Sequence, residues 1–128
     1  MLGWFRRISN VVPRALLRSP LHGLLSRGVL LITVTGRRSG RAITTPVHYV
    51  QRGDAVYITS RRGRRWWRNV QPPARVTLRL RGHSRRGLGG VLEDEAGRAE
   101  ARAAFTGSVL AHVLDRPDLV IVRVRLDG

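Results

Sequence analysis

The sequence has 128 residues, a length that predicts one domain with a modest hydrophobic core of its own. All 24 basic residues are arginine, against 8 acidic ones, so the net charge of +16 favours anionic partners: nucleic acid, anionic lipid or a polyanionic cofactor. The absence of cysteine excludes disulfides and thiolate chemistry, and the absence of an apolar run of about 18 residues excludes a transmembrane helix.

Residues 1–26 predict a helical lead-in to a single domain over residues 27–128. Trp4 and Phe5 begin an apolar pattern of helical spacing between arginines, and prolines break the stretch into pieces. Such a helix packs on the domain or on a second subunit; alternatively, residues 1–18 make a peripheral contact with a membrane surface. No signal peptide is predicted, so we expect a cytoplasmic protein, with membrane association as the alternative.

The first strands are predicted on both sides of a glycine-rich turn. Gly28 to Thr35 is nearly all apolar, which is typical of a strand buried on both faces. Ile43 to Val50 is predicted to pair with it, and Pro46 within this run indicates a strand edge or a bulge beside a ligand. Gln51 to Asp54 has the composition of a hairpin turn and leads to a third strand, Ala55 to Ser60.

The turn between the first two strands begins the pattern around which the chain is organised, TGRRSGRAITTP at residues 35–46. Gly36 and Gly40 tolerate positive φ, so the backbone can fold back sharply and present its N–H groups to an anion. The anion-binding candidates in and beside that turn are Arg37, Arg38, Ser39, Gly40 and Arg41. The alternative is a solvated hairpin loop whose arginines keep a sheet edge soluble.

A second arginine-rich stretch, residues 61–69, contains two adjacent tryptophans. A short helix is predicted to begin near Arg64, and its N-terminus would attract anions. Trp66 or Trp67 would form a flat wall against a tricyclic ring, and the interleaved arginines would equally let them stack on nucleobases. Alternatively, one tryptophan lies in the core and the other at an interface.

The remaining elements complete a mainly β (α+β) chain. Arg75 to Arg81 and Leu119 to Leu126 alternate apolar with polar residues, which predicts strands with one buried face. Gly87 to Glu93 is a weaker strand because glycines dilute it, and Glu95 to Leu114 is predicted to be one alanine-rich helix. Six strands with short connections predict a closed antiparallel barrel, accompanied by an N-terminal helix, a short inserted helix and one longer helix.

No side chains form an obvious catalytic group. The four histidines lack metal-ligand spacing, so no metal site is predicted. The carboxylates of residues 93–95 precede a helix and are interpreted as capping residues. Because neither a nucleophile nor an acid–base pair is apparent, the catalytic residues are not assigned, and a cofactor would have to supply the chemistry of an enzyme.

The segment TGRRSGRAITTPVHY resembles the signature of the deazaflavin (coenzyme F-420)-dependent nitroreductase family. The resemblance continues through Tyr57 to Ser60, Arg65 to Val70 and Val76 to Arg79, and it covers roughly residues 19–94. It implies a six-stranded split β-barrel of the FMN-binding, flavin-reductase-like type, assembled as a homodimer.

The resemblance also implies a site and a reaction. The phosphate and glutamate tail of coenzyme F-420 would lie along residues 37–41, and the deazaflavin ring would lie near Pro46, Val47, Ser60, Trp66 and Asn69. The reduced coenzyme would then deliver a hydride to a quinone, nitroaromatic or enone acceptor. The alternatives are a flavin (FMN)-binding protein of the same fold and a basic nucleic-acid-binding module without enzymatic activity. The latter is disfavoured because no helix-turn-helix, zinc-finger or RNP pattern occurs.

Three positions depart from the resembled family. The segment Ser60 to Trp66 is shorter, which weakens the expected cover over the cofactor phosphate. A tyrosine expected near the end of the last helix is absent; Leu110 stands about there, with His112 close by, so substrate activation by a phenol hydroxyl lacks its residue. Arg116 to Leu119 replaces an isoleucine-proline pair. These differences predict a divergent member, or one that binds the cofactor without the best-known activity.

Overall fold

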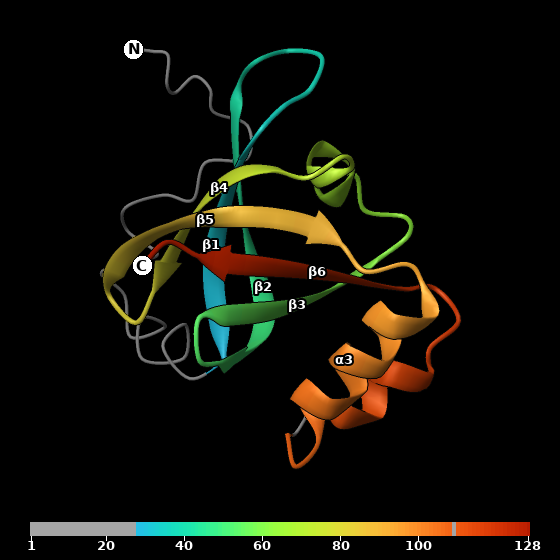
Figure 1. The fold of residues 1–128 in the computed structure, drawn as a ribbon. Helices are drawn as coiled ribbons and strands as arrows, with labels where there is room; N and C mark the ends of the chain where they lie inside the picture. Colours follow the sequence, from blue (N-terminus) through green and yellow to red (C-terminus); the bar gives the residue numbers. More distant parts are fainter. Residues whose placement is uncertain (1–27, 109) are drawn as a thin grey trace.

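Six strands close into an antiparallel barrel in the order β1-β2-β3-β6-β5-β4 (Figure 1). The computed structural model describes residues 28–108 and 110–128, so the predicted helical lead-in and membrane contact lie outside the described residues. The strands are β1 (Val29–Thr35), β2 (Ala42–Arg52), β3 (Ala55–Arg61), β4 (Ala74–Leu80), β5 (His83–Val91) and β6 (Leu119–Leu126). The predicted six-stranded barrel is therefore confirmed.

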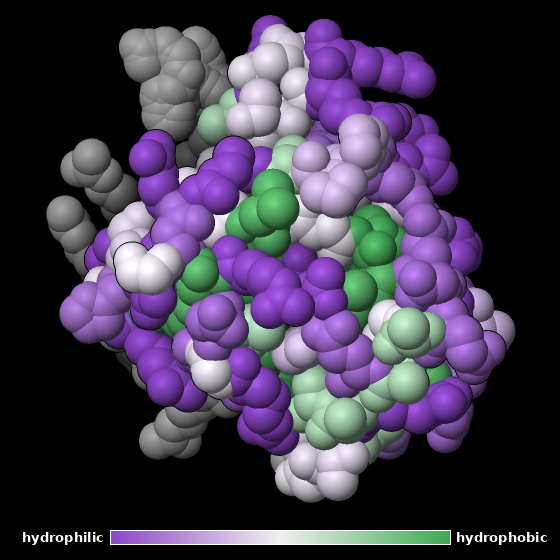
Figure 2. All heavy atoms as spheres, in the orientation of Figure 1, coloured by the Kyte–Doolittle hydropathy of each residue, from purple (hydrophilic) through white to green (hydrophobic). Residues whose placement is uncertain are grey.

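Alternating side chains fill the barrel, as the period of two along the strands requires. Leu30, Ile32 and Val34 of β1 enter the same cluster as Leu78 of β4 and Val122 of β6. Pairing of β1 with β4 closes the cylinder, with Ile32 opposite Leu78. Figure 2 shows the outer face that carries β5 and β6 as mostly hydrophilic, broken by small separate apolar groups.

β5 begins at His83, four residues before its predicted start at Gly87. The first four residues of β5 are polar and lack the alternation that predicts a strand. They nevertheless pair with β4, with Leu80 opposite His83 and Leu78 opposite Arg85. Residues 83–86 are exposed, so they need no apolar side chains to belong to the sheet. Backbone pairing rather than burial therefore holds this half of β5.

The helix predicted near Arg64 is the five-residue 3₁₀ helix η1 (Trp66–Val70), which packs on the barrel interior. Its N-cap, Arg65, makes no side-chain cap, and five residues are too few for the anion-attracting helix N-terminus that we expected. Val70 is fully buried, and a Cβ built on Gly89 of β5 would lie 3.4 Å from its Cγ1. The glycines of β5 thus leave the space into which η1 packs.

The predicted long helix is wrong in its second half, because α3 (Glu95–Phe105) ends nine residues before Leu114. Asp94 caps its N-terminus by accepting a hydrogen bond from Gly97 N at 2.7 Å, as its carboxylate predicted. Gly107 has φ +80°, a left-handed conformation that stops the helix. The chain then forms a second 3₁₀ helix, η2 (Ala111–Asp115), before β6.

No helix among the described residues has the length and hydrophobicity to cross a membrane.

A second core joins α3 to the outside of the barrel (Figure 1). Phe105 is fully buried and meets Tyr57 of β3 edge to face, with ring centroids 6.4 Å apart. The Tyr57 hydroxyl donates to Glu100 Oε2 at 2.5 Å, and Arg123 Nη1 of β6 donates to Glu100 Oε1 at 2.6 Å. Burial, followed by the hydrogen bond and charge of Glu100, raises the pKa of Tyr57 to about 12. The hydrogen bonds from Tyr57 and then Arg123 hold the pKa of Glu100 below its ordinary value.

We expect Glu100→Gln to lower the free energy of unfolding by about 1–2 kcal/mol at neutral pH, because it removes a partly exposed, charge-assisted pair. A depressed carboxyl pKa contributes stability above its unfolded-state value and loses it as pH falls through the folded-state pKa. Urea titrations should therefore show the gap between variant and wild type closing below the ordinary pKa of glutamate. Asp115→Asn, at an exposed position of η2, is the control. An equal loss in that variant, or a gap between Glu100→Gln and wild type that widens in acid, would contradict the assignment.

Candidate functional site

The barrel is split where β2 and β3 move apart. These strands pair only between Tyr49–Arg52 and Ala55–Ile58, whereas β3 pairs with β6 along its whole length. The first half of β2 therefore pairs with β1 alone, and Pro46, opposite Leu31, lies on an edge that needs no N–H donor. The prediction of an edge at Pro46 is confirmed, and the barrel wall opens beside it.

A cavity of about 630 Å³ occupies this opening. β2 and β3 provide two of its walls, η1 and the preceding loop a third, and η2 with the turn into β6 the fourth. Its lining residues are Pro46, Val47, His48, Thr59, Ser60, Arg61, Arg64, Trp66, Leu110, His112, Val113, Arg116, Asp118 and Leu119. The volume lies within the range of small-molecule and cofactor sites.

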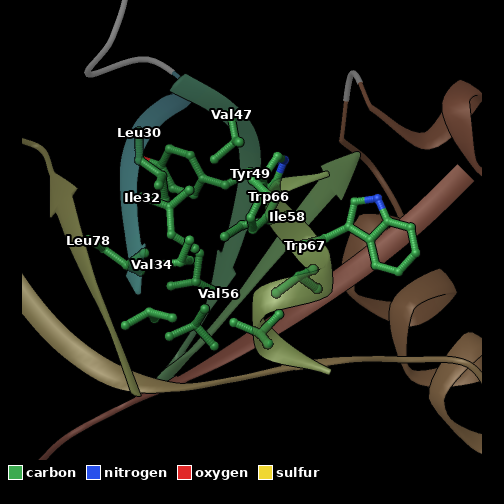
Figure 3. Close-up of a cluster of buried hydrophobic side chains, with 14 of the residues drawn as sticks. Leu30, Ile32, Val34, Val47, Tyr49, Val56, Ile58, Trp66, Trp67 and Leu78 are labelled. Atoms are coloured by element: carbon green, nitrogen blue, oxygen red, sulfur yellow. The ribbon is translucent and has the colours of Figure 1, made fainter. Parts of the chain in front are cut away.

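Trp66 separates this cavity from a smaller one of about 230 Å³, lined by Ile43, Thr45, Arg64, Arg65, Trp66 and Asn69. Arg64 and Trp66 line both cavities, so the two adjoin at these side chains. Trp66 is 6% exposed and belongs to the barrel core with Val47, Tyr49 and Ile58 (Figure 3). The rigid core thus positions the indole between the two spaces.

The arginine loop at residues 36–41 is tied to η1 by Asn69. Asn69 Oδ1 accepts from Arg37 N at 2.9 Å, and Asn69 Nδ2 donates to the carbonyl of Trp66 at 3.1 Å. Arg37 Nη1 adds a bond to the carbonyl of Gln71 at 2.9 Å. Asn69 therefore positions the loop beside the smaller cavity.

The backbone of this loop is largely occupied by its own hydrogen bonds. Gly36 N donates to Arg41 O and Gly40 N to Gly36 O, both at 2.8 Å, and Arg41 N donates to Ser39 Oγ at 3.1 Å. With Arg37 N also bonded, few amides are left for the concave backbone site that we expected. The guanidinium groups of Arg38 and Arg41 have no protein partner in the described part of the chain, so their donors are left free for an external acceptor.

The predicted site residues fall into two groups. Pro46, Val47, Ser60 and Trp66 line the larger cavity, and Asn69 joins Trp66 in the smaller one. Residues 37–41 line neither cavity and form the adjoining loop. Trp67 also lines neither; it is 4% exposed and its Nε1 donates to the carbonyl of Arg61 at 3.0 Å.

Sequence reasoning missed several cavity residues, above all His48, Arg61, Arg64, His112 and Arg116. In the sequence, these arginines do not stand out from the general excess of arginine, and the histidines are scattered without a recognisable spacing. A backbone hydrogen bond from Arg62 N to Asp118 O at 2.9 Å joins the loop after β3 to the turn before β6. Within that turn, Leu119 N donates to Arg116 O at 3.3 Å. Leu110, which stands about where the family tyrosine was expected, does line the cavity.

Comparison with known proteins adds a family and a fold. A family model described as F420H(2)-dependent quinone reductase matches residues 9–116. No curated protein matches the sequence.

Three solved structures show the fold. A candidate pyridoxamine 5′-phosphate oxidase from Listeria innocua is 14% identical, with a TM-score of 0.58 over 84% of this chain and 91% of its own. The heme storage protein HutZ from Vibrio cholerae is 15% identical, with a TM-score of 0.53 over 80% and 83%. A candidate 5-nitroimidazole antibiotic resistance protein from Bacteroides thetaiotaomicron is 13% identical, with a TM-score of 0.55 over 84% and 78%. At these identities the likeness shows the split β-barrel alone.

Proposed function

Because the chain belongs to the F420H(2)-dependent quinone reductase family, we propose that it is an oxidoreductase that binds reduced coenzyme F-420. The acceptor is a small molecule: a quinone, a nitroaromatic or an enone. The observation that supports this proposal is the succession of the arginine loop, which Asn69 holds beside the smaller cavity, and the larger cavity, which adjoins the smaller one at Arg64 and Trp66.

The chemistry along this path fits a long anionic cofactor with a flat ring. Arg38 and Arg41 suit a phosphate and glutamate tail, because guanidinium groups bind both bidentately. Arg64 and Arg65 continue the positive charge along the smaller cavity. Trp66, Val47 and the other apolar residues of the larger cavity offer a surface for a tricyclic ring.

The protein's own residues then bind, orient and exclude water. The indole of Trp66 packs against the ring. Pro46 and Val47, in the cavity wall formed by β2, hold the ring from the other side. Ser60 supplies a hydroxyl at the end of β3, and Asn69 keeps the tail loop in register with η1. The bound coenzyme supplies the hydride. Positioning in a site shielded from water is the contribution of the fold.

We expect Arg38→Ala to weaken binding of coenzyme F-420 about tenfold and to leave binding of a tailless deazaflavin core nearly unchanged. Each charge-assisted hydrogen bond is worth about 1.5–3 kcal/mol, and Arg38 has no protein partner in the described residues that would compete with the tail. Titrations of intrinsic tryptophan fluorescence at two salt concentrations measure both ligands, and high salt should weaken only the tailed form. Arg98→Ala, on the exposed side of α3, is the matched control.

The same titrations separate the alternatives. If Arg38→Ala weakened binding of the tailed and tailless forms equally, the loop would not be part of the site. If FMN bound as tightly as coenzyme F-420 or more tightly, a flavin protein would be favoured. A nucleic-acid-binding module predicts that neither deazaflavin binds and that Arg38→Ala reduces the salt slope of oligonucleotide binding by about one unit.

The homodimer is proposed from the family resemblance, and the cytoplasmic location from a composition without cysteine, which suits a reducing compartment. Light scattering of the full chain should give about twice the monomer mass of 14.3 kDa. Liposome co-sedimentation with and without residues 1–18 tests the alternative of membrane contact.

A further inference from the structure

The larger cavity combines an apolar floor with a cationic rim. Trp66 and Val47 are buried at its base, and Leu110, Val113 and Leu119 are partly buried around it. Three exposed arginines line it from separate segments: Arg61 at the end of β3, Arg64 before η1 and Arg116 after η2. The proposed deazaflavin ring would cover Trp66 and Val47, and a planar acceptor stacked on that ring would lie among Leu110, Val113 and Leu119. A neutral acceptor would leave the three arginines without a partner.

The rim arginines are not neutralised by the protein. The ion pairs among the described residues are Arg75 with Asp127 and Arg123 with Glu100, and neither reaches the cavity. Asp118 is the one carboxylate in the lining, against three guanidinium groups. An anion bound there would gain charge-assisted hydrogen bonds in a partly enclosed, partly apolar space, where they are stronger than in open water.

Two of these arginines stand apart from the proposed path of the coenzyme tail. Arg64 lines both cavities, whereas Arg61 and Arg116 line only the larger one, and the tail loop adjoins the smaller one. Arg61 pairs in register with Leu119, whose N–H donates to the carbonyl of Arg116 at 3.3 Å, so the backbone holds the two arginines on adjoining walls of the cavity. On the proposed path, the coenzyme tail therefore leaves Arg61 and Arg116 available to a second anion.

We infer that the acceptor is itself an anion, a planar quinone or nitroaromatic that carries a carboxylate or sulfonate bound by Arg116 and Arg61. This inference rests on the proposed function and names its substrate class. A quinone that accepts a hydride and one proton, both lost by the reduced coenzyme, becomes the hydroquinone. The anionic substituent takes no part in that exchange and serves only to hold the acceptor.

The test compares a matched pair of acceptors, 1,4-naphthoquinone-2-sulfonate and the neutral 2-methyl-1,4-naphthoquinone, with reduced coenzyme F-420. Arg116→Gln and Arg61→Gln should each raise KM for the sulfonate about tenfold and change KM for the neutral quinone less than about twofold. Arg98→Gln is the control, and melting temperatures verify that the variants fold. Equal effects on the two acceptors, or no preference of the wild type for the sulfonate, would overturn the inference.

A binding measurement without coenzyme separates this inference from the proposed function. Calorimetry of the full chain with naphthalene-2-sulfonate should show binding that Arg116→Gln weakens about tenfold, whereas neutral naphthalene-2-sulfonamide should bind the two proteins alike. If coenzyme F-420 fails to bind while this result holds, the proposed function falls and the anion site stands. If Arg116→Gln weakens coenzyme F-420 and leaves the sulfonate unaffected, Arg116 belongs to the tail site and the inference is wrong.

Discussion

Replacing Trp67 by alanine should lower the free energy of unfolding by about 3–5 kcal/mol, although it removes no side chain that lines either cavity. Trp67 is 4% exposed, its Nε1 donates to the carbonyl of Arg61, and Arg68 lies 5.4 Å from its ring centroid. In Figure 3 its indole points away from Val47 and Tyr49. Its role is therefore to fasten η1 to the end of β3.

Trp66→Ala should instead weaken binding of the coenzyme, by about 1–3 kcal/mol if the ring stacks on the indole as bases stack on aromatic side chains. Trp66 is also buried, so the substitution will lower stability as well, and binding must be measured well below the melting temperature of each variant. Trp66→Phe keeps an aromatic surface and should restore part of the affinity.

Urea titrations give the stabilities of these variants, and fluorescence of the coenzyme itself gives the affinities, since each variant loses one tryptophan. If Trp67→Ala abolishes binding and Trp66→Ala leaves it intact, the assignment of the two indoles is off by one residue. If neither variant changes binding, the ring does not lie at η1.

Gly87→Ala should destabilise the barrel by about 3 kcal/mol, at the upper end of what overpacking costs. A Cβ at Gly87 would lie 2.4 Å from the carbonyl oxygen of Arg125 and 2.7 Å from Val124 Cγ1. The first of these atoms belongs to the backbone of β6, so it cannot move aside without opening the β5–β6 pairing. Because the closed barrel depends on every one of its strand pairings, including β5 with β6, the strain acts on the whole barrel.

Gly90→Ala is the control on the same strand. Its Cβ would meet only the ring of Pro73, at 3.3 Å, and that exposed side chain can shift, so we expect a loss of about 1 kcal/mol or less. Thermal unfolding followed by circular dichroism compares the two variants. Equal melting temperatures would show that β5 and β6 tolerate a wider separation than the structure has.

Much of the fold was predictable because strand signals are local. Alternation over Leu119 to Leu126 located β6 at its observed bounds, and the apolar run from Gly28 located β1. The inaccurate predictions are at places where a turn or a pairing with another strand overrides the local preference of the residues for helix or strand. Alanine-rich sequence favoured helix past Phe105, but Gly107 turned the chain. Polar residues at 83–86 gave no strand signal, yet β4 pairs with them.

The sequence by itself determined the period-two strands and the resemblance to the family, which pointed to Pro46, Val47, Trp66 and Asn69 among the cavity residues. Periodicity and short motifs are both read from residues close together in the chain. Only the tertiary structure decided which tryptophan faces the cavities and which fastens η1. It also decided that the loop amides bond to protein acceptors, and that Arg61 and Arg116 meet across the larger cavity. The physical reason is closure of the barrel: segments distant in sequence become neighbours only when the sheet curves round, and no local pattern records which side chains then share a space.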